Sequence, residues 1–207
     1  MKIASFTFDD GFYNTAIKIL KINIPATFYL VTDWLKPNAI IEDTFNLNAN
    51  HGNIQLWNHI KVDIGCHSLK HERNFDEFLC YESFKKIFKK PYNFATPYGI
   101  KYKSKHFCSC KIGYYGSPYN NTNIKNLNQL QSINIKHDVN EKELYNIVKK
   151  SPNNCWLIFT FHGIEEGWKP VTEEEIINLY DMLTHNHFVI KNISEVVNEI
   201  CFGSYLL

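Results

Sequence analysis

Hydrophobic and polar positions along the chain alternate between two kinds of segment. Short runs rich in β-branched and aromatic residues are typical of strands that are buried on both faces. Segments with apolar residues at helical spacing lie between most of these runs. Predicted strands cover residues 2–8, 26–31, 61–66, 93–96, 112–116, 133–136, 155–161 and 187–190, and predicted helices cover residues 14–22, 76–90, 140–150, 172–185 and 192–200.

Apolar positions in the first two predicted helices define the faces that we expect to pack against the sheet. These positions are Ala16, Ile19 and Leu20 in the first helix, and Phe78, Tyr81, Phe84 and Phe88 in the second. The second helix ends in lysines, which suit the negative end of the helix dipole.

The order of the predicted elements indicates a fold class. Strand and helix alternate within one chain, which favours a parallel α/β fold. The number of such units, about eight, favours a barrel over an open sheet. Because no Pro/Gly/Ser-rich linker interrupts the pattern, we expect a single domain over residues 1–207.

Composition and charge narrow the class of partner and the location. The formal net charge is +1, so no overall field attracts nucleic acid, and no nucleic-acid partner is expected. No run approaches the ~18 consecutive apolar residues of a membrane span, and the first residues lack the pattern of a signal peptide, so a cytoplasmic location is expected. The six cysteines lack the spacing of a disulfide framework, and we interpret the sequence CSC at 108–110 as structural.

Reactive or turn-forming residues follow four predicted strands at the point where each strand ends. They are Asp9 and Asp10 after residues 2–8, His67 after residues 61–66, the sequence PYG after residues 93–96, and His162 after residues 155–161. In a parallel α/β barrel the C-terminal ends of the strands meet on one face, and that face carries the chemistry. We therefore expect these side chains to converge on one site.

The sequence HSLKH, residues 67–71, indicates a metal site. His67 and His71 are four residues apart, so on a helical turn they would lie on the same side and could share one ion. A carboxylate from another strand end would complete a two-His, one-Asp site with open positions. One of the two adjacent aspartates would bind the metal, whose charge relieves their repulsion, and the other would accept a proton from water. His162 would then protonate the leaving group of an amide or ester.

Four sequences, TFDDG, HSLKH, PYG and FTFHGI, occur in this order. Together they resemble the motifs of the polysaccharide deacetylases, the NodB-homology or carbohydrate esterase 4 family, from residue 5 to about residue 165. The resemblance implies a distorted (β/α) barrel of seven or eight units. It also implies a hydrolase that removes acetyl from an N-acetylated amino sugar of a glycan or sugar precursor, with acetate as a product.

The same resemblance implies roles for individual residues. A divalent metal, usually zinc, with Co²⁺, Ni²⁺ or Mn²⁺ as alternatives, would be held by Asp10, His67 and His71. Asp9 would be the general base and His162 the general acid. The expected partner is therefore a carbohydrate.

Three further residues are candidates for contact with the substrate. The resemblance implies that the backbone N–H of Tyr98 stabilises a tetrahedral oxyanion, with Pro97 beside it in the same motif. Trp168, like Trp34, follows a predicted strand end, where an exposed indole could stack on a sugar ring. Trp168 is the better candidate, and the alternative for both is packing within a loop.

The chain departs from the family pattern in two places. The third motif usually has an arginine two residues before the proline, where it orients the catalytic aspartate, and this chain has Ala95 there. Arg73 is a candidate substitute, with an ordinary surface charge as the alternative. The fourth motif is not recognisable, and Asp138 is either a residue that orients His162 or the N-cap of the next helix.

These departures leave two alternatives to a glycan deacetylase. The first is a non-catalytic carbohydrate-binding relative that kept the pocket and lost turnover. The second keeps the chemistry but acts on a small N-acyl sugar, by deacetylation or deformylation. Measurements of bound metal and of acetate release distinguish these hypotheses.

Overall fold

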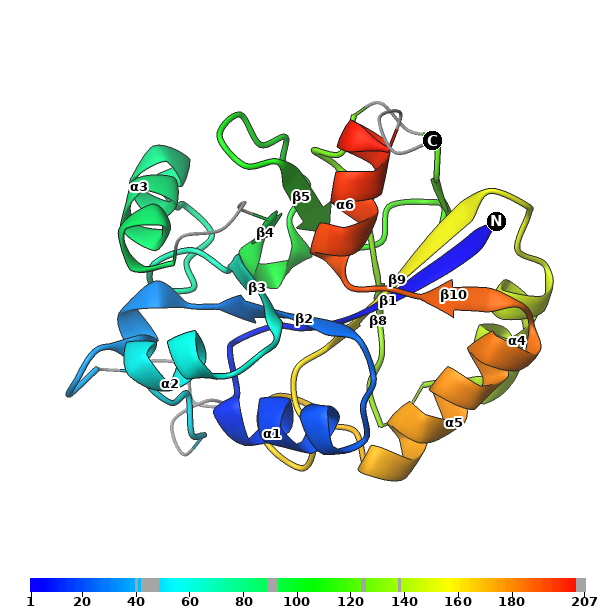
Figure 1. The fold of residues 1–207 in the computed structure, drawn as a ribbon, viewed down its shortest axis with the longest axis horizontal. Helices are drawn as coiled ribbons and strands as arrows, with labels where there is room; N and C mark the ends of the chain where they lie inside the picture. The colour runs from blue at the N-terminus through cyan, green and yellow to red at the C-terminus, as the bar shows by residue number, and fades with distance from the viewer. Residues whose placement is uncertain (40, 42–48, 89–92, 124–125, 138, 204–207) are drawn as a thin grey trace.

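A computed structural model of the protein describes residues 1–39, 41, 49–88, 93–123, 126–137 and 139–203. Strands and helices alternate along most of the chain (Figure 1). The elements are β1 (Lys2–Phe8), α1 (Tyr13–Lys21), β2 (Ala26–Leu30), η1 (Thr32–Leu35), α2 (Ile54–His59), β3 (Asp63–Cys66), α3 (Glu77–Ile87), β4 (Asn93–Ala95), η2 (Pro97–Gly99), β5 (Ser109–Ile112), β6 (Asn120–Asn121), β7 (Leu130–Gln131), β8 (Ile133–Asn134), α4 (Glu141–Lys149), β9 (Cys155–Phe161), α5 (Glu173–His185), β10 (Phe188–Ile190) and α6 (Ile193–Phe202).

The strands curl into a distorted barrel. Strand order is β6-β9-β1-β2-β3-β4-β5-β7, and the pairs from β9 to β7 are parallel. Only Ser132 separates β7, which pairs with β5, from β8, which pairs with β9. This segment therefore links the two sides of the sheet. The predicted α/β barrel is confirmed.

Side chains alternate between the two faces of each strand, and the two faces differ in character. On β1, Phe6 and Phe8 belong to the larger apolar core, which also contains side chains of the surrounding helices α1, α3 and α5. Ser5 and Thr7 have the opposite parity and point into the barrel. The apolar face thus holds the helices, while the inner face is free to carry polar groups.

Helix α6 closes the end of the barrel where the strands begin. Its Ser194 donates through the backbone N–H and the hydroxyl to the carboxylate of Asp63, at the start of β3. The N–H of Ile193 donates to the hydroxyl of Thr27 on β2. Ile193 also packs with Trp156 in a second apolar cluster. Among the described residues, the barrel is therefore covered at the N-terminal ends of its strands and open at their C-terminal ends.

Eight strands were expected, and each expected run contains or borders a strand. The largest shift concerns β5, which lies at Ser109–Ile112 and not at residues 112–116. Its lysine made the run look unlike a buried strand. Strands β6 and β7 have two residues each, too few to produce a pattern.

The expected faces of two helices need correction. Leu20 on α1 is 40% exposed, whereas Ala16 and Ile19 are buried. Phe78 on α3 is 57% exposed, and the buried face of that helix is Glu77, Cys80 and Phe84. Glu77 is buried because its carboxylate accepts hydrogen bonds from the segment after η2, at Tyr102, Ser104, Lys105 and His106. Because these donors satisfy the Glu77 carboxylate, the face of α3 that carries Glu77 is buried, and the face predicted from the apolar residues is not.

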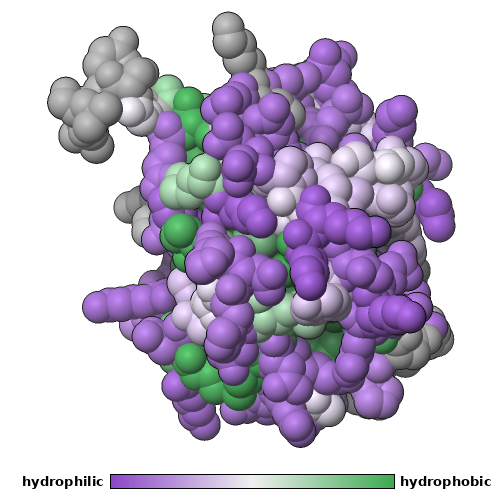
Figure 2. Space-filling model, turned by 90° about the vertical axis from the view of Figure 1, so that its right-hand side faces the viewer, coloured by the Kyte–Doolittle hydropathy of each residue, from purple (hydrophilic) through white to green (hydrophobic). Residues whose placement is uncertain are grey.

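One face of the molecule is largely polar (Figure 2). Figure 2 shows a face on which hydrophobic side chains form only small, separate areas among hydrophilic ones. In the described part of the chain, no helix combines the length and the apolar character that a membrane crossing requires.

Gly65 on β3 allows a close contact inside the barrel. A Cβ at this position would lie 2.5 Å from the ring of Tyr29 and 2.8 Å from the carbonyl oxygen of Asn93. Since overpacking a core typically costs about 1–3 kcal/mol, we expect Gly65→Ala to lower the free energy of unfolding by about 2 kcal/mol in urea titrations. Lys103→Ala, at an exposed position, is the control, because it changes no packing inside the barrel. Equal losses in the two variants would contradict the packing argument.

Candidate active site

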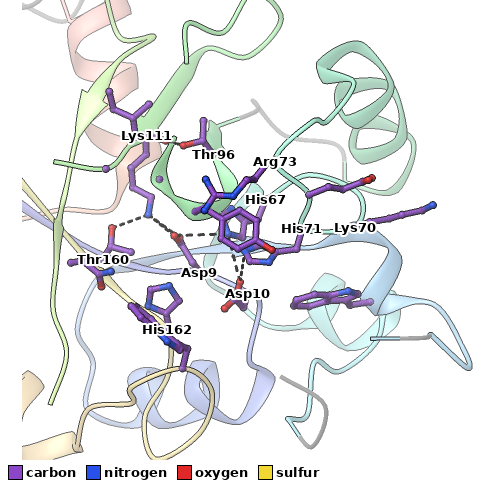
Figure 3. A pocket seen from close by; sticks show the side chains of 18 of the residues that line it. Asp9, Asp10, His67, Lys70, His71, Arg73, Thr96, Lys111, Thr160 and His162 are labelled. Atoms are coloured by element: carbon purple, nitrogen blue, oxygen red, sulfur yellow. Dashed lines mark hydrogen bonds and ion pairs between the residues drawn. The ribbon is translucent and has the colours of Figure 1, made fainter. Parts of the chain in front are cut away.

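The strand ends bring the predicted site residues to the open mouth of the barrel. Asp9 continues the inward parity of Ser5 and Thr7, and His162 continues that of Thr160 on β9. His67 follows β3 in the same way. Figure 3 shows these side chains with Asp10 and His71 around one space. The expected convergence of residues far apart in sequence is present.

Asp10, His67 and His71 are arranged as a metal site. The Oδ1 atom of Asp10 lies 3.6 Å from Nε2 of His67 and 3.5 Å from Nε2 of His71. One ligand atom from each of the three residues lies within 4.8 Å of the other two. Tetrahedral zinc with bonds of 2.0–2.1 Å separates its ligand atoms by roughly 3.3 Å. The three side chains therefore fit one divalent ion.

The imidazole of His67 is prepared for metal binding. Its Nδ1 is 2.8 Å from the carbonyl oxygen of Ala95, so Nδ1 carries the proton and Nε2 is left to bind an ion. Burial lowers the pKa of His67 to about 3, although the charge of Asp9 opposes this shift. The ring is thus neutral at pH 7, which is the state that coordinates a metal.

The two histidines do not lie on a helical turn, contrary to expectation. Residues 67–71 form an irregular loop, and His71 has a left-handed backbone with φ of 60°. Its N–H donates to the hydroxyl of Ser68, whose carbonyl accepts from Thr32 of η1. A side-chain turn anchored to η1 therefore brings the two rings to a centroid distance of 5.0 Å.

Asp10 is held by a strained backbone. Its φ is 71°, in the region that few residues other than glycine adopt. The Nδ1 of buried His51 donates to the Asp10 carbonyl at 2.9 Å, and His51 itself packs against Trp34 and Phe12. His51 is thus a packing residue that supports the Asp10 turn.

Asp9 lies beside the triad and is bound by a lysine. The Nζ of Lys111, on β5, is 2.8 Å and 2.9 Å from the two carboxylate oxygens of Asp9 (Figure 3). The nearer approach of Asp9 to His67 is 4.0 Å, from Oδ2 to Nε2. Burial by itself raises the pKa of Asp9, but the charge and hydrogen bond of Lys111, together with the electrostatic effects of His67 and His162, outweigh it and leave this pKa below the ordinary value. Asp9 is therefore an ionised carboxylate that does not share the position of Asp10.

Lys111 was missed in the sequence. It belongs to β5, which begins three residues before the strand predicted at residues 112–116, so the pattern does not mark it as a strand residue. Those cysteines are free thiols: Cys110 is buried and Cys108 is exposed. The signal that could have revealed Lys111 is a single lysine at an inward position of a strand, where charge is expensive unless it is paired.

His162 and Trp168 form the side of the site opposite the histidine pair. Their rings meet edge to face at 4.9 Å. Burial lowers the pKa of His162 to about 4, against the attraction of Asp9, so the ring is neutral at rest. Its buried Nδ1 has no hydrogen-bond partner among the described residues. Asp138, the candidate to orient it, lies outside those residues.

The remaining candidates occupy different surroundings. Tyr98 is 53% exposed, has φ of 57°, and places its ring 4.6 Å from that of His71. Arg73 stacks on the Tyr98 ring at 4.6 Å, so the cation that contacts Asp9 is Lys111 and not Arg73. Pro97 is buried at the start of η2. Trp34 is buried against His71, in line with the alternative of packing within a loop.

A large cavity surrounds this site, with a volume of about 1570 Å³. The metal-site residues and His162 form its floor, and aromatic side chains form part of its wall. Among these are Tyr98, Tyr114, Tyr115 and Trp168. Lys136 and Lys169 place their ammonium groups over the Trp168 ring, at 5.2 Å and 5.7 Å. The indole is therefore partly engaged by cations of the protein itself.

Comparisons with known proteins find similarity in structure only. No protein-family model matches the chain, and no curated protein matches its sequence. The Xyl-CE4 domain of a multidomain xylanase from the hindgut metagenome of Trinervitermes trinervoides superposes with a TM-score of 0.56 at 16% identity, over 96% of this chain and 90% of that one. The chitin deacetylase of the fungal pathogen Colletotrichum lindemuthianum gives 0.54 at 15% identity, over 94% and 86%.

A third similar structure is a mutant of a CE4 family pseudoenzyme, with a TM-score of 0.53 at 14% identity over 95% of this chain and 67% of that one. The three similarities extend over nearly the whole chain, well beyond the four short motifs. At these identities they establish the arrangement of the backbone. The chain therefore has the fold of the carbohydrate esterase 4 polysaccharide deacetylases, and at the level of the fold the resemblance seen in its sequence is confirmed.

Proposed function

We propose that this chain is a metal-dependent hydrolase that removes N-acetyl groups from amino sugars of a glycan or sugar precursor and releases acetate. The observation that carries the proposal is the convergence of Asp10, His67 and His71 on one point, with ionised Asp9 beside them. Residues that only stabilised the fold would not need two adjacent carboxylates, one facing two histidines and the other paired with a lysine.

The protein's own groups divide the work of amide hydrolysis. A zinc or similar ion held by Asp10, His67 and His71 would polarise the substrate carbonyl and favour ionisation of water. Asp9 would accept the proton of the attacking water. His162, which also lines the cavity, would protonate the leaving amine. Because burial keeps its pKa near 4, His162 must acquire that proton after the substrate has bound.

The oxyanion that develops on the acetyl group needs a donor besides the metal. The backbone of Tyr98 lines the cavity in a left-handed conformation, at the start of the loop that follows β4. We assign its N–H this role, with buried Pro97 fixing the turn.

The cavity favours a glycan over a small N-acyl sugar. Its volume of about 1570 Å³ exceeds the ~300–1,000 Å³ typical of small-molecule sites. The similar structures include a chitin deacetylase and a domain of a xylanase. Exposed aromatic rings at the cavity, such as those of Tyr98 and Tyr114, suit the apolar faces of sugar rings.

Removal and return of the metal tests this function. We expect the purified protein to release acetate from N-acetylglucosamine oligomers, to stop after treatment with a chelator, and to recover when Zn²⁺ or Co²⁺ is added back. The reason is that the carbonyl and the water lose their activating charge without the ion. Acetate is measured by a coupled enzymatic assay, and metal content by elemental analysis.

Two results would contradict parts of the proposal. Acetate release that continues at full rate in metal-free protein would exclude a metal-dependent reaction. One equivalent of tightly bound metal without release from any N-acetylated amino sugar would favour the carbohydrate-binding alternative, in line with the pseudoenzyme among the similar structures.

A further inference from the structure

Lys111 makes a complete set of contacts inside the barrel. Its ammonium group donates to both carboxylate oxygens of Asp9 and to the hydroxyl of Thr160, each within 2.9 Å. These three acceptors match the three hydrogens of a lysine ammonium. The side chain is only 3% exposed, so no hydrogen is left for solvent. A buried cation satisfied in this way fixes the position of the carboxylate that it binds.

The hydroxyl of Thr160 is itself held in one orientation. Thr7 donates to the carbonyl oxygen of Phe159, so the Thr7 oxygen is left to accept from Thr160 at 3.3 Å. The oxygen of Thr160 is then directed to accept from Lys111. On the other side, the ammonium lies 5.1 Å from the centre of the Tyr29 ring, which packs on Gly65. Lys111 is therefore braced by three other strands.

The cation that contacts Asp9 comes from β5, whereas the family pattern has an arginine at the position of Ala95 on β4. Ala95 of β4 is the register partner of Lys111 on β5. Partners on neighbouring strands of a sheet point to the same face, so both side chains enter the barrel. The small side chain at Ala95 leaves this level of the barrel to Lys111.

We propose that Lys111 is the positioning residue of Asp9, and that it holds this carboxylate beside the metal site so that Asp10 alone supplies the carboxylate ligand. The inference rests on the proposed function, because it assigns Lys111 a part in turnover through Asp9. Two adjacent carboxylates near a cation would otherwise compete for it. The ammonium group of Lys111 pairs with the carboxylate of Asp9, whereas the carboxylate of Asp10 faces His67 and His71.

Kinetics of Lys111→Ala provide the first test. With the metal loaded, we expect kcat for acetate release to fall about 10- to 100-fold, as for other residues that orient a functional group, with little change in KM. Lys103→Ala, an exposed lysine outside the cavity, is the matched control and should match the parent protein. A Lys111→Ala protein with unchanged kcat, or with a change confined to KM, overturns the proposal.

Moving the cation to the neighbouring strand gives a sharper test. In Ala95→Arg/Lys111→Ala, an arginine enters the barrel at the same register from β4, into space left by the lysine. We expect kcat to recover about tenfold over Lys111→Ala. If Lys111 only stabilised the fold, an arginine introduced on β4 would not restore kcat. If the swapped protein is folded and metal-loaded but as slow as Lys111→Ala, the positioning role is contradicted.

A stability cycle tests the contact without any need for turnover. Lys111→Ala leaves Asp9 as a buried charge without a partner, and Asp9→Asn leaves Lys111 in the same condition. The double variant Asp9→Asn/Lys111→Ala removes both charges, so its melting temperature should exceed that of each single variant. Additive losses would contradict the coupling of Lys111 to Asp9. If the coupling is found but the parent protein releases no acetate, the proposed function fails while the contact stands.

Discussion

The Asp9→Asn variant is expected to keep its divalent metal and to lose about 10²- to 10⁴-fold in kcat, the range that a general base contributes. An amide has no basic oxygen for the proton of water, yet it nearly preserves the shape of the carboxylate. Metal should remain because Asp9 stands 4.0 Å from the nearest ligand nitrogen and is occupied by Lys111. Acetate release and elemental analysis of the same sample check both parts.

A second consequence of Asp9→Asn is a loss of stability. The amide offers one acceptor where the carboxylate offered two, and it removes the charge that balances a buried ammonium. Asp181→Asn on α5, at an exposed position, is the matched control and should change neither property. Full activity in Asp9→Asn would refute its assignment as the base, whereas loss of metal would show that the two aspartates share the ion.

The adjacent residues Asp9 and Asp10 lie in different surroundings although their side chains are identical. Asp9 still has the extended backbone of β1 and points into the barrel, where Lys111 binds it. Asp10 turns into the left-handed region and presents its carboxylate to His67 and His71. The difference arises from backbone conformation and from partners on distant strands, so no feature of the dipeptide itself determines it.

Much of the fold was predictable because it depends on local pattern. The runs 2–8 and 155–161 match β1 and β9 residue for residue, since both strands are buried on two faces and consist mostly of apolar and β-branched residues. Convergence of the strand ends then follows from parallel topology. The positions of Asp9, His67 and His162 at one mouth could therefore be inferred without a structure.

What could not be predicted depends on contacts between distant segments. Phe78 has the pattern of a buried residue, but a hydrogen-bonded carboxylate at Glu77 takes the inner face of α3. The convergence of His67 and His71 was expected for the wrong reason, because a loop held by Ser68 replaces the helical turn. Lys111 lies 102 residues from Asp9 along the chain, and its contact with Asp9 depends on the register of β4 and β5, which sets it beside Ala95.

The His67→Ala variant is expected to lose both the metal and detectable acetate release. Two ligands remain after this change, fewer than the three protein ligands of a catalytic zinc site. The melting temperature provides a readout that needs no substrate: a metal that binds only the folded protein stabilises it by about 4 kcal/mol at 1,000 times its Kd. Zn²⁺ should therefore raise the melting temperature of the parent protein and leave that of His67→Ala unchanged.

The control for His67→Ala must remove a histidine without touching the cavity. His137 is exposed and pairs with Glu175 at the start of α5, so His137→Ala should retain the metal-dependent rise in melting temperature and the release of acetate. Retention of one equivalent of Zn²⁺ by His67→Ala would mean that the ion is held elsewhere. In that case the buried, neutral imidazole fixed by the carbonyl of Ala95 would be a packing group, and amide hydrolysis at this mouth of the barrel would lose its physical basis.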